Sequence, residues 1–338
     1  MSEFETGRLV GGSADEIRAS IPKYFDMPVD ETMLASQPIE RQSYETTIGA
    51  TFSATGPGTY RGKAARTLNF LPTDKPGWWF DRTDQERQLP IGVSVRNVWT
   101  TIRSIVLRSG SPHNYMRMVE HIIALKLGMG LDNLMIRMDS GDPPLFNVGA
   151  MDLVEGVEKA GIVETQRPLT YWAVKEPVTI GGRNGSFLTI LPPEDKSGRL
   201  YVDCAIDFDC AIGQQRIQFD LYPETFRKGA HARTNCTSGM MLYTKTIGKL
   251  FADTRHLGYT HDNILIAGKT EYVNTPALMH NGKSLEAVWH RAVLDLIAAL
   301  GLIDTGRLCG RVYSYKAGHA LDVEMMTQLF MHDLLEVV

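Results

Sequence analysis

The stretch MVEHIIALKLGMGLDN, residues 118–133, is mostly apolar, yet Glu120 and His121 stand side by side near its start. A helix that is apolar on nearly every side is typical of one buried between two layers of a protein. Burying a carboxylate beside an imidazole is costly unless the two are paired, bound to a metal or facing a wet cleft. The pair therefore indicates either a half-exposed helix start, with the acid favoured by the helix dipole, or a functional site.

The composition of the 338-residue chain excludes several classes of protein. It has 35 Lys and Arg against 39 Asp and Glu, so it lacks the basic excess of nucleic-acid-binding proteins. No apolar run approaches the ~18 residues of a membrane span, and the start of the chain lacks the apolar core of a signal peptide. The four cysteines have no CxxC spacing, which favours a reduced protein. We expect a soluble, cytoplasmic, globular protein whose oligomeric state the sequence leaves open.

The order of the predicted elements divides the chain into an extension and two halves. Residues 1–42 are polar and irregular apart from a short helix predicted at residues 14–25, so we predict an N-terminal extension outside the core fold. Residues 43–166 and residues 167–338 each begin with short β-rich segments, broken by Gly and Pro turns, and continue into helices. Two such halves predict an α+β fold of two domains. The main helices are predicted at residues 115–127, 150–161, 285–302 and 320–337.

A second candidate pair lies in EAVWHRAVLDLIAAL, residues 286–300, where His290 precedes Asp295 by five positions. Imidazole nitrogen and carboxylate oxygen both suit Zn²⁺. In a regular α-helix, five residues rotate by about 500°, which leaves the two side chains roughly 140° apart. One π-bulge would return them to the same face, and such bulges occur at functional sites. The alternative, a surface His with an unrelated Asp, stays open.

Two further stretches place polar groups where a site could use them. In HARTNCTSG, residues 231–239, the hydroxyl of Thr234 could either hold a developing oxyanion or cap a turn. In YKAGHAL, residues 315–321, His319 opens the predicted terminal helix. It could cap that helix or act as a general acid, and periodicity does not decide between the two.

In this order, the four stretches resemble the UDP-3-O-acyl-N-acetylglucosamine deacetylases, the zinc amidases of lipid A biosynthesis. The similarity runs from about residue 41 to residue 330. It includes TGPGTYRGKAARTLNFLP, VEGVEKAGI, ETFRKGAHART and YSYKAGHAL. The family fold has two domains, each with a β-sheet layer, and its helices pack between the two sheets. The resemblance therefore implies the same sandwich here, with the active site at the junction of the domains.

The resemblance also implies a role for each candidate residue. Glu120 would be the general base, Thr234 would steady the oxyanion, and His319 would be the cationic acid that protonates the leaving amine. The bound zinc would lower the pKa of its water toward ~7. The implied zinc ligands are His121, His290 and Asp295. The implied substrate-binding residues are Arg291, Lys316 and Asn235.

Several positions depart from the family pattern. The extra residue within the histidine–aspartate ligand pair breaks the family's i, i+4 spacing, so this pair requires the bulge. Arg291 takes the place of a lysine that meets the nucleotide's phosphate. Ala299 stands where the family has an acid, so His319 loses a partner that would raise its pKa. Asn235 replaces an aromatic residue, so one wall of the ligand pocket becomes polar.

The sequence thus predicts a zinc-dependent hydrolase that removes the N-acetyl group from a UDP-3-O-acyl-N-acetylglucosamine-like substrate. Its expected partner is an acylated, nucleotide-linked amino sugar. Two alternatives stay open. One is a diverged homologue that acts on a changed N-acyl substrate, and the other is a metal-free descendant that binds such a ligand for structure or regulation.

Overall fold

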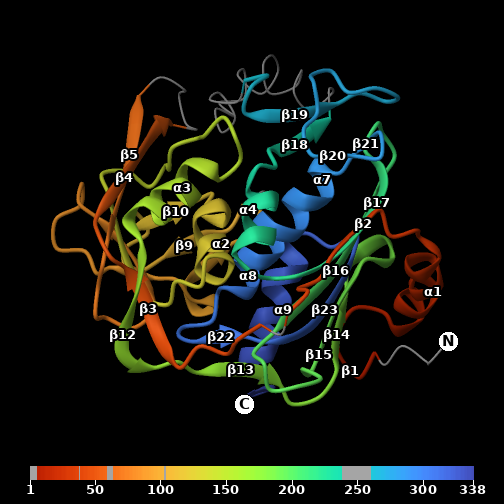
Figure 1. Cartoon of the computed structure of the whole chain (residues 1–338), viewed down its shortest axis with the longest axis horizontal. Coiled ribbons are helices and arrows are strands. Elements are labelled where there is room, and N and C mark those ends of the chain that lie inside the picture. The colour runs from red at the N-terminus through yellow and green to blue at the C-terminus, as the bar shows by residue number, and fades with distance from the viewer. Residues whose placement is uncertain (1–5, 38, 59–63, 103, 238–259) are drawn as a thin grey trace.

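Two β-sheets form the outer layers of the molecule, and helices pack between them (Figure 1). The computed structural model describes residues 6–37, 39–58, 64–102, 104–237 and 260–338. The five-stranded sheet has the order β4 (Phe52–Pro57), β5 (Ala65–Leu71), β11 (Leu134–Met138), β6 (Trp78–Arg82) and β7 (Ile91–Gly92). The seven-stranded sheet has the order β1 (Arg8–Gly11), β14 (Val178–Gly181), β15 (Phe187–Leu191), β23 (Gly310–Tyr315), β16 (Leu200–Phe208), β17 (Gly213–Asp220) and β2 (Glu31–Met33).

The layer between the sheets is helical, which confirms the predicted α+β sandwich. Its helices are α2 (Glu120–Gly128), α3 (Met151–Ala160), α4 (Pro223–Ala230), α7 (Glu286–Trp289), α8 (Ile297–Leu300) and α9 (His319–Met331), with the π-helical segment η3 (His290–Leu296) joining α7 to α8. One continuous hydrophobic core takes residues from both sheets and from these helices. None of the described helices is long and apolar enough to cross a membrane.

Smaller sheets and short helices also occur among the residues that the structure describes. The small sheets are β8–β9–β10 (Val98–Thr100, Val106–Arg108, Tyr115–Arg117), β3–β12 (Tyr44–Ile48, Ile162–Pro168), β13–β22–β24 (Tyr171–Val174, Arg307–Leu308, Leu335–Val337), β18–β19 (Thr234–Thr237, Ile264–Ala267) and β20–β21 (Met279–His280, Lys283–Ser284). The 3-10 helices are η1 (Val95–Asn97) and η2 (Arg183–Gly185). β18 lies where α4 leads out of the helical layer (Figure 1), and this position brings β18 to the candidate site.

α2 is the central helix of the layer. Residues 122–128 are all buried, as expected for a helix that is apolar on every side. Gly128 lies so close to Phe226 of α4 that an added Cβ atom would come within 2.0 Å of the ring. A larger residue at this position would therefore push α2 and α4 apart. The charged group within this run, Lys126 Nζ, donates to Gly301 O at 3.1 Å and to Ile303 O, which ties α2 to the end of α8.

The burial of Lys126 gives a testable pH dependence of stability. Burial lowers the pKa of the Lys126 amine from 10.5 to about 8. Below pH 8 the Lys126 amine is charged in both the folded and the unfolded chain, and folding bears the full cost of burying that charge. Between these two pKa values the folded chain has released its proton and the unfolded chain has not, so the free energy of unfolding rises with pH. The expected total is about 3 kcal/mol.

The K126M variant isolates this effect because other titrating groups are common to both proteins. Urea unfolding at several pH values between 7 and 11 should show a wild-type minus K126M difference that increases with pH. A difference that stays constant with pH would show that Lys126 is already neutral, or fully solvated, in the folded protein.

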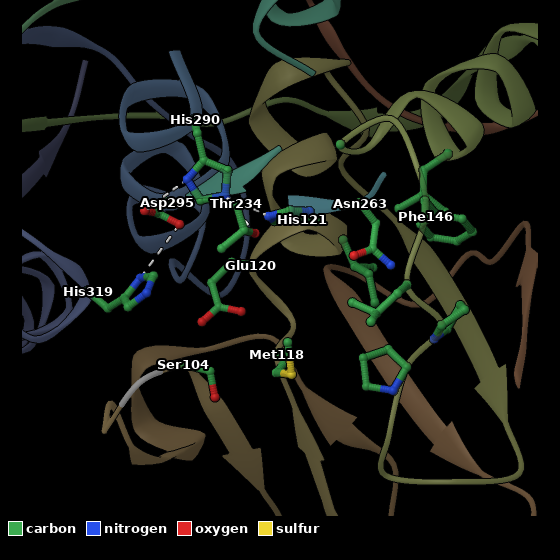
Figure 2. Close-up of a pocket in the computed structure, with 16 residues that line it drawn as sticks. Ser104, Met118, Glu120, His121, Phe146, Thr234, Asn263, His290, Asp295 and His319 are labelled. Atoms are coloured by element: carbon green, nitrogen blue, oxygen red, sulfur yellow. Dashed lines mark hydrogen bonds and ion pairs between the residues drawn. The ribbon is translucent and has the colours of Figure 1, made fainter. Parts of the chain in front are cut away.

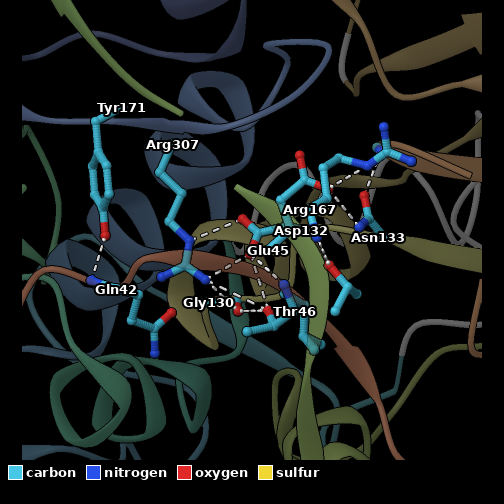
Figure 3. A network of polar contacts seen from close by, with 12 residues as sticks. Gln42, Glu45, Thr46, Gly130, Asp132, Asn133, Arg167, Tyr171 and Arg307 are labelled. Atoms are coloured by element: carbon cyan, nitrogen blue, oxygen red, sulfur yellow. Dashed lines mark hydrogen bonds and ion pairs between the residues drawn. The ribbon is translucent and has the colours of Figure 1, made fainter. Parts of the chain in front are cut away.

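The loop after α2 is held by a polar network at the junction of the two halves (Figure 3). Arg307 donates to both carboxylate oxygens of Asp132, at 2.9 and 2.8 Å, and to Gly130 O at 2.8 Å. The same carboxylate accepts from Thr46 N at 2.8 Å. Asn133 donates to the carboxylate of Glu45 at 2.8 Å. Residues 130–133 (GLDN) therefore fix the C-terminal end of α2 against strands from both halves.

The N-terminal segment contributes to the second sheet. β1 pairs in parallel with β14 and β2 pairs in parallel with β17, so these strands form the two edges of the seven-stranded sheet. Between them, α1 (Ala14–Asp26) lies on the outer face of that sheet (Figure 1), where Arg216 Nη1 donates to Tyr24 O at 3.0 Å. The predicted helix at residues 14–25 is confirmed. The expectation that residues 1–42 lie outside the core fold does not hold for β1 and β2, and the domain boundaries stay a prediction.

Other predicted elements differ at their ends. The helix expected at residues 115–127 begins only at Glu120, because Tyr115–Arg117 forms β10 and Met118 then turns the chain with a φ of 51°. A positive φ at a non-glycine residue costs energy and persists where the surroundings enforce it. The terminal helix ends at Met331, and the chain finishes in β24. Gly161 closes α3 with a φ of 74°, as predicted.

Candidate active site

A cavity between the two halves collects the catalytic and metal-ligand candidates from four separate elements. Figure 2 shows their side chains converging from α2, η3, β18 and α9. The predicted residues that line the cavity are Glu120, His121, Thr234, His290, Asp295 and His319. Residues so far apart in sequence meet because α2 packs against η3 and α8 in the middle of the layer. The structure therefore brings together all three predicted catalytic residues and all three predicted metal ligands.

The bulge that the His290–Asp295 spacing requires is present. Residues His290–Leu296 form a π-helix between the regular helices α7 and α8. As a result, His290 Nδ1 lies 3.5 Å from Asp295 Oδ2, and both side chains face the cavity. A regular helix would point them roughly 140° apart. The extra residue in this helix has therefore been absorbed without separating the pair.

The two imidazoles from the two halves face each other. His121 Nε2 and His290 Nε2 are 3.0 Å apart, and Thr234 Oγ1 lies 3.1 Å from the same His290 nitrogen. A hydrogen bond to the backbone of Gly149 orients His121. Burial, reinforced by the neighbouring His290, lowers the pKa of His121 to about 3. His121 is therefore neutral at physiological pH, which is the form that binds a metal.

Glu120 is a buried carboxylate at the first turn of α2. The backbone N–H of Ile105 donates to its Oε1 atom, which orients the group toward the cavity. Burial raises the pKa of Glu120 above its usual range, and the opposing attraction of His319 only partly offsets this effect. A carboxylate with a raised pKa accepts a proton more readily near neutral pH. Its environment therefore suits a general base.

His319 at the first turn of α9 is held between carboxylates. Its Nδ1 atom lies 3.8 Å from Asp295 Oδ1. Burial lowers the pKa of His319, but the charges of Asp295 and Glu120 outweigh burial, so the pKa is raised overall. Ala299, at the position where the resemblance implies a supporting acid, is buried in α8. The expectation that this change leaves His319 without an acidic partner is wrong, because Asp295 takes that place.

The three predicted substrate-binding residues lie outside the lining of the cavity. Arg291 is buried, donating to Ala317 O at 2.7 Å and to Asp322 Oδ1 at 2.6 Å. This burial does not fit the phosphate contact that the resemblance implies. Lys316 pairs with an aspartate at 3.7 Å, and Asn235 sits within the β18–β19 pair. For these two, a substrate-binding role stays a prediction.

Sequence patterns missed several residues that line the cavity. Asn263 is a buried amide at the start of β19, and Ser104 precedes the Ile105 N–H that orients Glu120. Phe146 (Figure 2) adds apolar surface from the loop before α3, and Leu145 of the same loop also lines the cavity. Single polar or aromatic residues in loops leave no periodic signal, so only their position in the fold reveals them. The loop that carries Pro143, Pro144, Leu145 and Phe146 forms a wall that is more apolar than the side with Glu120, His121 and Asp295.

The donor chemistry of the site fits a zinc ion. Within the part of the chain that the structure describes, no three His, Cys, Asp or Glu side chains form a ready-made ligand cluster. The types and states of the donors are nevertheless those that zinc prefers, since His121 is neutral and faces His290 across 3.0 Å. Burial would raise the pKa of Asp295, but His290 and His319 outweigh it and lower the pKa, so this carboxylate is ionised.

Known proteins match most of the chain. The model of the family described as LpxC, UDP-3-O-acyl N-acetylglycosamine deacetylase, matches residues 45–331. The chain is 29% identical over 292 residues to proteins named UDP-3-O-acyl-N-acetylglucosamine deacetylase from Brucella ovis, Brucella canis and Brucella melitensis biotype 2. Each of these alignments covers 85% of this chain and 95% of the relative. Because the family match spans well over half of its length, the chain belongs to the UDP-3-O-acyl N-acetylglycosamine deacetylase family.

Proposed function

We propose that this protein is a zinc-dependent deacetylase that removes the N-acetyl group from UDP-3-O-acyl-N-acetylglucosamine, a reaction of lipid A biosynthesis. Family membership supports the substrate class. The observation that carries the proposal is the π-helix of η3, which keeps His290 and Asp295 together opposite His121 despite the extra residue. A cytoplasmic location stays a prediction.

The metal would be held by His121, His290 and Asp295. When bound, a zinc ion supplies a Lewis acid that acidifies water and polarises a carbonyl oxygen. Glu120 takes the proton from the attacking water, for which its raised pKa and its fixed orientation on Ile105 N–H prepare it. The water oxygen then forms the new bond to the acetyl carbon.

Thr234 and His319 act on the other atoms of the amide. The Thr234 hydroxyl, on β18 beside His290, donates to the oxygen that becomes negative as the carbonyl is attacked. His319, whose pKa is raised by its carboxylate neighbours, places a positive charge on the side of the amide opposite Thr234. It then gives its proton to the leaving nitrogen as the C–N bond breaks. The products are acetate and the free amine.

A second candidate function is deacylation of a related substrate that lacks the usual phosphate contact. The burial of Arg291 in its contact with Asp322 favours this alternative, because the guanidinium does not line the cavity. Comparing kcat/KM for an acylated N-acetylglucosamine with and without its UDP group would separate the two. A large loss without UDP supports the first function, and an unchanged value supports the second.

Metal analysis tests the proposal most directly. Protein purified without added zinc should contain about one zinc ion per chain, as in other three-ligand catalytic sites. The H121A variant should lose the metal and the release of acetate together. The T234A variant is the matched control, since it should keep the metal and lose only turnover. A wild-type protein that binds no metal at any zinc concentration would instead support the metal-free descendant.

A further inference from the structure

Glu31 is a buried carboxylate in the N-terminal segment, ahead of the residues 45–331 that match the family. It lies on β2, where it is paired with Ile217 of β17 at the edge of the seven-stranded sheet. The residue is 9% exposed, and its side chain reaches Trp289 of α7 in the helical layer. Lys, Glu, Arg and Asp are almost never buried without partners, so the partners of Glu31 indicate what it holds.

The partners of Glu31 come from three elements around the candidate site. Trp289 Nε1 at the end of α7 donates to Glu31 Oε2 at 2.9 Å. Lys228 of α4 forms an ion pair with Oε1, and His280 Nδ1 on β20 lies 3.1 Å from the same oxygen. Trp289 directly precedes His290, and α4 leads through a short turn to Thr234. The Glu31 carboxylate thus contacts the residue that precedes His290 and the helix that leads to Thr234.

Trp289 marks the point where the regular helix gives way to the π-helix. Its indole is fully buried and packs against Phe219, with ring centroids 5.3 Å apart. A buried indole N–H without an acceptor is unfavourable, so the Glu31 carboxylate fixes the orientation of this ring. π-helices are rare because regular α-helical hydrogen bonding competes with them. An anchor directly before η3 therefore favours the register in which His290 and Asp295 stay together.

The N-terminal segment is attached by contacts that do not involve Glu31. Asp30 accepts from Arg216 N at 2.9 Å and from Lys283 Nζ at 2.7 Å. Arg216 in turn donates to the carbonyl groups at the end of α1, and β1 pairs with β14 along its length. A substitution at Glu31 should therefore leave the segment in place and change only its contact with the helical layer.

We infer that Glu31 is a positioning residue for the metal site: through Trp289, it holds the start of η3 in the register that keeps His290 and Asp295 on one face. This inference rests on the proposed function, because it concerns the same ligands. It gives a role in the site to the N-terminal segment, which lies outside the residues 45–331 that match the family.

The zinc dissociation constant, measured by competition with a chromogenic chelator, tests the inference without an activity assay. E31L should weaken zinc binding by about tenfold, a typical effect of losing support behind a metal ligand. E31Q keeps an acceptor for the indole and should stay within about threefold of the wild type. W289F removes the N–H donor and should match E31L, and the double variant should be no weaker than either. E194Q, which changes an exposed carboxylate paired with Arg311, is the control and should leave zinc affinity unchanged.

Several results would overturn the inference. Zinc affinities of E31L and W289F equal to that of the wild type would show that Glu31 only stabilises the fold, as would strictly additive effects in the double variant. If E31L does not fold, W289F alone decides, because it leaves Glu31 paired with Lys228 and His280. A wild type that binds no zinc would overturn the proposed function together with this inference. A wild type that binds zinc as tightly as its W289F variant would overturn only the inference.

Discussion

The E120Q variant should lose turnover by about 10²–10⁴-fold, the usual contribution of a general base, while its zinc content stays that of the wild type. Glutamine has nearly the same shape as glutamate and keeps an oxygen to accept from Ile105 N–H, so the position of the side chain should be retained. It cannot take a proton from water. Because Glu120 is not among the proposed ligands, metal analysis and steady-state kinetics on the same preparation separate the two roles.

The matched control is E45Q. Glu45 is also a buried carboxylate whose pKa is raised by burial, but it contacts Asn133 at the junction of the halves and does not line the cavity. If E45Q keeps its turnover and E120Q does not, the removal of a buried charge is not in itself the cause of the loss. The position of Glu120 in the cavity is then what matters. Equal activity of E120Q and the wild type would assign the base to another group, with His319 the nearest candidate.

The parts of the site with a local signature could be predicted from sequence. An apolar helix that begins with Glu120 and His121 is visible because burial imposes composition on every face of a helix. The bulge at His290 could be predicted because a five-residue separation is incompatible with a shared face in a regular helix. In both cases the structural requirement, burial or a shared helix face, is visible in the sequence of a single segment.

Other features could not be predicted because they depend on contacts between distant segments. β1 and β2 are short edge strands of polar composition, and only their pairing with β14 and β17 distinguishes them from irregular chain. The partner of His319 is a similar case. A position-by-position comparison finds Ala299 in place of an acid, but it cannot show that Asp295 presents one oxygen to His290 and the other to His319.

Arg291 shows how such a contact changes the role of a residue. As the neighbour of His290 it resembles a basic residue that meets a phosphate, yet it does not line the cavity. It donates to Ala317 O and to Asp322 Oδ1, and these two residues flank the start of α9, where His319 lies. Asp322 is fully buried. Burial raises its pKa, and Arg291 opposes that effect. The ion pair therefore connects the segment that carries His290 to the turn that carries His319.

The R291M variant should lower the free energy of unfolding by about 3–5 kcal/mol, the usual cost of removing one partner of a buried ion pair. The cost arises because Asp322 would be left buried without its cation, and it must then either stay charged or bind a proton. Urea unfolding at neutral pH measures the change. R311M is the matched control, because Arg311 pairs with the exposed Glu194 and its loss should cost only about 0–1 kcal/mol.

A double variant separates the uncompensated charge from lost packing. R291M with D322L removes both charges, and well-packed apolar residues in place of a buried ion pair are often neutral or stabilising. The double variant should therefore be more stable than R291M alone, although it loses the Arg291 contact with the turn before His319. If the double variant is instead the less stable of the two, the loss in R291M reflects packing of the arginine side chain. If R291M is as stable as R311M, the guanidinium does not hold Asp322, and Arg291 would be available to meet a substrate phosphate.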